Sequence, residues 1–136
     1  MVRYLRMFYV GWLGLISAAI VLQLYLAGYG VFAFNGLPPF DAHRLLGDLI
    51  GIAILVAALL AFAARVPWRL TIINLVLLVL MAIQSVLAFA TVQAIAALHV
   101  VNGVLIFVGK LYLTWTAARL VWPGALDLPG AKAPHA

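Results

Sequence analysis

Two histidines occur in the same local pattern, H-x-x-x-G-x-L-I, at residues 43–50 and 99–106. Each histidine stands near the start of a long apolar run, where an ionisable side chain is costly and marks a functional site. Neutral imidazole is a common metal ligand, and histidine is an axial ligand of haem iron. Histidines from two facing helices of a bundle can bind one cofactor between them. We therefore predict that His43 and His99 are the metal ligands of a haem b.

The residues that accompany each histidine could help to hold a flat cofactor. Gly47 and Gly103 follow their histidines by four positions, so each lies one helical turn deeper on nearly the same face. Glycine leaves space beside the helix because it has no side chain. Small residues also serve close helix packing in membranes, which is the alternative for both glycines. Arg44 lies at the predicted interface, where its guanidinium could bond a haem propionate.

Two glutamines repeat in the same way as the histidines. Gln23 and Gln84 each begin the pattern Q-x-x-L-A in the run that precedes a histidine. Their amides could hold a ligand or a polar haem substituent, or could bond between helices. With Q-x-x-L-A followed by H-x-x-x-G in both halves, the chain is predicted to consist of two tandem helical hairpin repeats. Lys110 follows His99 by eleven residues, and we expect its amine to snorkel to the cytoplasmic interface.

The composition shows which environment these residues occupy. The 136 residues are 68% hydrophobic and 8% charged, whereas soluble domains carry about 25% charged residues. A soluble domain of this size cannot bury so much apolar surface, because it hides only about 70% of what its unfolded chain exposes. The chain has no cysteine, which excludes disulfides, thiolate metal sites and c-type haem attachment. Lipid is therefore the expected main solvent.

Long apolar runs divide the chain into a membrane domain and a tail. Each of the four runs exceeds the ~20 residues that cross a hydrocarbon core of ~30 Å. We predict an all-α integral membrane four-helix bundle, up-down-up-down, over residues 1–122, and a disordered cytoplasmic tail over 123–136. The predicted spans cover about residues 8–34, 42–64, 70–92 and 94–122.

Positive charges predict the orientation of this bundle. Arg3 and Arg6 precede the first span, and Arg65 and Arg69 separate the second from the third. Because positive residues favour the cytoplasmic side, both termini are predicted to be cytoplasmic, in a prokaryotic inner membrane. The basic residues are scattered singly rather than clustered on one face, so the net charge of +5 does not indicate a nucleic-acid partner.

At these residues the chain resembles a known family. The run Phe40-Asp41-Ala42-His43-Arg44 at the start of one helix, with His99 at the start of the helix two further on, resembles one four-helix half of haem A synthase. This resemblance implies a histidine pair that binds haem in the outer half of the membrane. Three features depart from that family: Phe40 stands near the place of its glutamate, its cysteine pair is absent, and there is one bundle. We therefore do not predict haem A synthase-type oxygenation or assign an enzymatic activity.

A second resemblance is closer and less informative about activity. The chain is similar to a small uncharacterised prokaryotic family of four-helix membrane proteins, which implies no known activity. The positions that carry this similarity are Gln23, 26–28, 41–44, Gly47, Gln84, 98–99 and 102–103.

The residues and the first resemblance lead to one functional expectation and two alternatives. We expect a membrane haem-b protein with bis-histidine ligation that transfers electrons or binds and hands on haem. It would meet the lipid bilayer and a membrane redox partner or larger complex. The alternatives are a haem-free scaffold or accessory subunit of a larger membrane complex, and a quinone or small-molecule carrier. The oligomeric state, the electron donor and the electron acceptor do not follow from the sequence.

Overall fold

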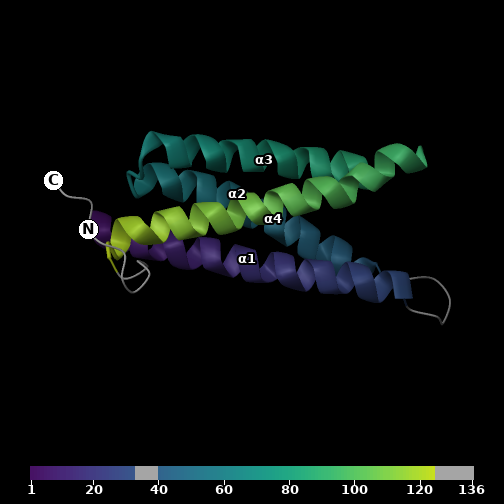
Figure 1. Ribbon diagram of the computed structural model, residues 1–136, viewed down its shortest axis with the longest axis horizontal. Helices are drawn as coiled ribbons and strands as arrows, with labels where there is room; N and C mark the ends of the chain where they lie inside the picture. Colours follow the sequence, from purple (N-terminus) through teal and green to yellow (C-terminus); the bar gives the residue numbers. More distant parts are fainter. Residues whose placement is uncertain (33–39, 125–136) are drawn as a thin grey trace.

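The computed structural model describes residues 1–32 and 40–124. These residues form four long α-helices, without a strand among them (Figure 1). The bounds are Val2–Phe32 for α1, Asp41–Ala63 for α2, Trp68–Ala88 for α3 and Gln93–Val121 for α4. The prediction of an all-α four-helix bundle is confirmed.

Each helix is long and apolar enough to cross a membrane. Their outward faces carry exposed large apolar side chains along the whole length, such as Leu15, Leu55, Val79 and Val108. A soluble bundle would place polar residues on those faces, because a helix that is hydrophobic all round must be buried or lie in lipid. The four helices therefore have the character of a multi-pass membrane protein.

The helix ends differ from the predicted spans at two places. α1 begins at Val2, six residues before the predicted start, so Arg3 and Arg6 lie within the helix rather than before it. α3 ends at Ala88, four residues before the predicted end. Its last turn tightens there, because the Phe89 and Ala90 N–H groups each bond a carbonyl three residues back. Residues 33–34 of the first span, most of the tail (125–136) and His135 lie outside the described residues.

The helices are arranged as a square in cross-section. α1 packs against α2 and α4, and α3 packs against the same two helices. Within the described part of the chain, α2 and α4 therefore lie diagonally across the bundle. The two hairpins, α1–α2 and α3–α4, lie close together at the end where α1 begins and α4 ends, and they diverge toward the other end (Figure 1).

Most of the apolar core lies toward the end of the bundle where the two hairpins are close together. Leu13, Ile54, Leu77 and Leu113, one from each helix, are almost completely buried there. Arg6 ties α1 to the end of α2 by donating to the carbonyl oxygens of Ala64 (3.2 Å) and Arg65 (2.8 Å). Since the packed core lies at this end, the histidine end is the part of the bundle that is free to form a cavity.

The side chain of Lys110 was predicted to snorkel to the cytoplasmic interface, but it does not. Its side chain is completely buried, and Nζ donates to Oδ1 of Asn74 on α3 at 2.7 Å. Lys110 shares an inward face of α4 with the buried residues Asn102, Ile106 and Leu113. The amine therefore meets an acceptor inside the bundle, and the expected snorkelling was wrong.

Candidate functional site

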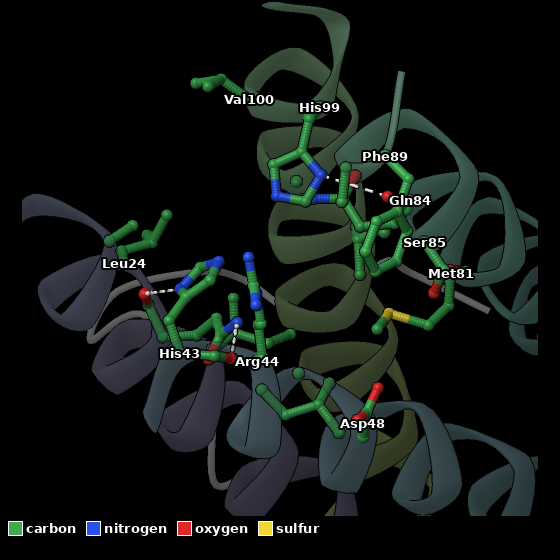
Figure 2. A pocket seen from close by; sticks show the side chains of 18 residues that line it. Leu24, His43, Arg44, Asp48, Met81, Gln84, Ser85, Phe89, His99 and Val100 are labelled. Carbon is green, nitrogen blue, oxygen red and sulfur yellow. Dashed lines mark hydrogen bonds between the residues drawn. The ribbon is translucent and has the colours of Figure 1, made fainter. Parts of the chain in front are cut away.

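A cavity of about 320 Å³ opens between the diverging hairpins (Figure 2). It receives side chains from all four helices. Every site residue predicted from the sequence lines it, although these residues are spread over most of the chain. They are Gln23, His43, Arg44, Gly47, Gln84, His99 and Gly103.

His43 is held by a reciprocal pair of hydrogen bonds between α1 and α2. Its Nδ1 lies 3.2 Å from the backbone carbonyl oxygen of Gln23, and the Gln23 side-chain amide donates to the carbonyl oxygen of His43 at 2.7 Å. A carbonyl oxygen can only accept, so Nδ1 carries the proton. In the neutral ring Nε2 then has the free lone pair, which is the arrangement of a metal-binding histidine.

His99 is held in the same way by the second hairpin. Its Nδ1 donates to the backbone carbonyl oxygen of Gln84 at 3.1 Å, so Nε2 again carries the lone pair. Here the Gln84 side-chain amide also approaches the ring, with its Nε2 3.1 Å from His99 Nε2. The two predicted repeats thus build the same histidine anchor, because in each the backbone oxygen comes from the glutamine of the preceding helix.

The two imidazole rings point toward one another across the cavity (Figure 2). Their centroids are 6.2 Å apart and their planes are inclined at 60°. Two imidazole nitrogens that bind one metal ion from opposite sides, each at about 2 Å, bring the ring centroids to about 6 Å. The separation of His43 and His99 therefore matches that of two axial ligands on one iron.

The two glycines leave room beside the glutamine side chains. A Cβ atom at Gly47 would lie 3.1 Å from Nε2 of Gln23, and one at Gly103 would lie 3.3 Å from Nε2 of Gln84. Either contact is closer than ordinary van der Waals separation, so a larger residue would push the amide away. Both glycines line the cavity, and a side chain there would also reduce its volume.

Charged and aromatic side chains surround the rim of the cavity. Arg44 extends beside His43, and Asp48 lies one turn further along α2 (Figure 2). Phe40 meets the His43 ring edge-on, with the centroids 6.1 Å apart. Phe40 therefore packs against the His43 ring at the start of α2.

Asn102 was not predicted as a residue of the site. Asn102 is buried, and its Nδ2 donates to the Leu80 carbonyl oxygen (2.8 Å) and to Oε1 of Gln84 (2.7 Å). A polar residue just before Gly103, where the first repeat has Leu46, was the available signal. Other residues that line the cavity and were not predicted include Asp48, Met81, Ser85 and Phe89.

Comparison with known proteins identifies the family of the chain but no activity. The profile of a family of unknown function (DUF6220) matches residues 23–92, and the chain belongs to this family. The matched region contains Gln23, His43, Gly47 and Gln84 and ends before His99. No curated protein matches the chain, and no solved structure matches it.

Proposed function

We propose that this member of the DUF6220 family is a membrane haem-b protein in which His43 and His99 are the two axial ligands of one iron. The observation that carries the proposal is the matched pair of imidazoles. Both are anchored through Nδ1 to a backbone carbonyl, and their centroids are 6.2 Å apart. Anchoring the second nitrogen in this way is typical of metal-binding histidines.

The ligand set favours haem over a bare metal ion. Among residues 1–32 and 40–124, no group of three or more His, Cys, Asp or Glu could hold a metal ion. A bare zinc ion in a protein takes three or four protein ligands. Haem brings its own equatorial nitrogens and needs only axial ligands from the protein. Two imidazoles across a cavity are therefore a sufficient set for haem.

The remaining cavity residues suit the two chemical faces of this cofactor. Ile20, Ile50 and Ile106 supply apolar side chains for the macrocycle. Arg44 lies at the rim, where a guanidinium can bond the propionates. The cavity volume of about 320 Å³ falls at the low end of the range for ligand pockets, and it opens where the hairpins diverge. A macrocycle would thus sit between the hairpins with one edge toward the lipid or the membrane surface.

The residues define what the site can do with a bound haem. Haem supplies a one-electron redox couple. His43 and His99 would hold the iron between them, so the role of these residues would be to bind and orient the cofactor. Electron transfer, or the binding and handing on of haem, is the function that follows.

Leucine in place of the two cavity glycines is expected to expel the cofactor. In the Gly47→Leu, Gly103→Leu double variant, the new side chains displace the Gln23 and Gln84 amides and fill the space beside the histidines. The haem content of the purified protein, measured by the pyridine haemochrome spectrum, should fall more than tenfold (about 1.4 kcal/mol per factor of ten), while insertion into the membrane is unchanged.

Gly28→Leu is the matched control for this experiment. A Cβ atom at Gly28, on α1 near the same end, meets nothing within 4 Å. This variant should keep the haem content of the unchanged protein. Full haem content in the Gly47→Leu, Gly103→Leu variant would show that the glycines serve helix contact and not cofactor clearance.

We also propose that the cavity lies toward the outer side of the membrane, with both termini in the cytoplasm. Arg3, Arg6, Arg65 and Arg69 lie at the end of the bundle where α1 begins, and Arg119 lies in the last turn of α4 at the same end. Arg44 is at the opposite end, and the positive-inside rule places the more basic end in the cytoplasm.

Fusions to alkaline phosphatase test this orientation, because the enzyme is active only outside the cytoplasm. A fusion after Ala136 should be inactive, and a fusion between α3 and α4, after Thr91, should be active. The reverse pattern would place the histidines on the cytoplasmic side.

A further inference from the structure

His43 and His99 are held in the same way through Nδ1, but their Nε2 atoms have different surroundings. His99 Nε2 receives a hydrogen bond from the Gln84 side-chain amide at 3.1 Å. In the first hairpin the Gln23 amide donates to the backbone carbonyl oxygen of His43, so it does not occupy the ring. No described residue donates to His43 Nε2, which leaves this nitrogen open to the cavity.

Asn102 explains why the two glutamines behave differently. Its side-chain amide bonds Gln84 Oε1 (2.7 Å) and is itself fixed on the Leu80 carbonyl oxygen (2.8 Å), so the Gln84 amide is aimed at His99. The corresponding residue of the first repeat is Leu46, which cannot donate. The Gln23 Oε1 atom is accordingly buried without a partner among the described residues.

We infer that the two histidines are unequal ligands, and that the site therefore takes a small neutral diatomic ligand in place of His99. This inference rests on the proposed haem site. His43 is the permanent ligand, because its Nε2 has no competing partner. His99 is the releasable ligand, because the Gln84 amide competes with the iron for the same lone pair. Gln84 and Asn102 act as positioning residues that set this competition.

The competition between the Gln84 amide and the iron can be removed without disturbing how the histidine rings are held. Both Nδ1 bonds go to main-chain oxygens, of Gln23 and Gln84, which every substitution at these positions retains. Gln84→Leu therefore removes only the amide that competes at His99 Nε2. Gln93→Leu removes an exposed amide of the same size at the start of α4 that does not line the cavity, so it is the matched control.

Carbon monoxide titration of the dithionite-reduced holoprotein is the test. Gln84→Leu should raise the carbon monoxide concentration at half-saturation roughly two- to twelvefold, because one hydrogen bond contributes about 0.5–1.5 kcal/mol. Asn102→Leu, which releases the Gln84 amide, should shift it in the same direction. Gln93→Leu, outside the cavity, should leave it unchanged. In both Gln84→Leu and Asn102→Leu, the low-spin fraction should rise in the absence of the gas.

The outcomes separate this inference from the proposed function. A wild-type protein with a bis-histidine haem spectrum that does not bind carbon monoxide would overturn the inference and leave the haem site standing. Equal shifts in Gln84→Leu and Gln93→Leu would also overturn it. A wild-type protein that takes up no haem would overturn both.

Discussion

His43→Ala and His99→Ala are expected to abolish the six-coordinate, low-spin haem signature. Each removes one of the two nitrogens that meet across the cavity, and no other described imidazole lines it. Loss of an outer partner of a metal ligand already weakens affinity about 10- to 100-fold, so loss of the ligand itself should reduce haem content at least as much or leave a five-coordinate, high-spin centre. Absorbance and electron paramagnetic resonance spectra of the purified variants measure this.

The chain offers a control for the general effect of removing a histidine. His135 lies in the tail, outside the described residues. His135→Ala should leave both haem content and spin state unchanged. Low-spin haem at full content in either His43→Ala or His99→Ala would show that the removed histidine is not a ligand.

The second large effect is expected at the buried lysine. Asn74→Leu removes the acceptor that lies 2.7 Å from Lys110 Nζ and leaves the amine alone inside the bundle. Leaving a buried donor without its hydrogen-bond partner costs about 1–3 kcal/mol, and more when the donor is charged, whereas replacing both partners with apolar groups of the same shape can be nearly neutral. Asn74→Leu should therefore lower the free energy of unfolding by about 3 kcal/mol, and Asn74→Leu, Lys110→Leu should recover most of the loss.

Thermal unfolding of the purified proteins in detergent checks this double-mutant cycle. Ser85→Ala is a suitable control, because Ser85 lies on the same helix but is exposed and makes one long bond of 3.5 Å to the Met81 carbonyl oxygen. It should change the unfolding temperature little. If Asn74→Leu and the double variant are equally stable, the Lys110 amine does not depend on Asn74.

The features that could be predicted from the sequence are the long apolar runs and the residues that recur in both sequence repeats. The apolar runs predict four helices because lipid requires about 20 apolar residues per span. His43 and His99 were predicted to meet because helices that alternate in direction bring the starts of α2 and α4 to one end. Gln23 and Gln84 precede them by one helix in each repeat, so the same alternation brings them to that end as well.

The residues that could not be placed depend on a side chain of another helix. Lys110 was expected at the interface because its spacing gives its depth but not the acceptor on α3 that keeps it inside. The role of Asn102 depends on reaching Gln84 and Leu80 across the α3–α4 contact, which no local pattern encodes. In the same way, the spacing of Gly47 and Gly103 predicts free space but not that the glutamine amides lie against it.

Haem binding between His43 and His99 can be measured by the absorbance spectrum of the purified protein. The protein is produced in membranes of cells supplied with ample haem, purified in detergent, and its absorbance spectrum is recorded oxidised and after dithionite reduction. We expect a coloured protein with one haem per chain and sharp α and β bands in the reduced state, as low-spin bis-imidazole iron gives. A protein that purifies colourless under these conditions would contradict it, and the histidines would then serve only to bond α2 to α1 and α4 to α3.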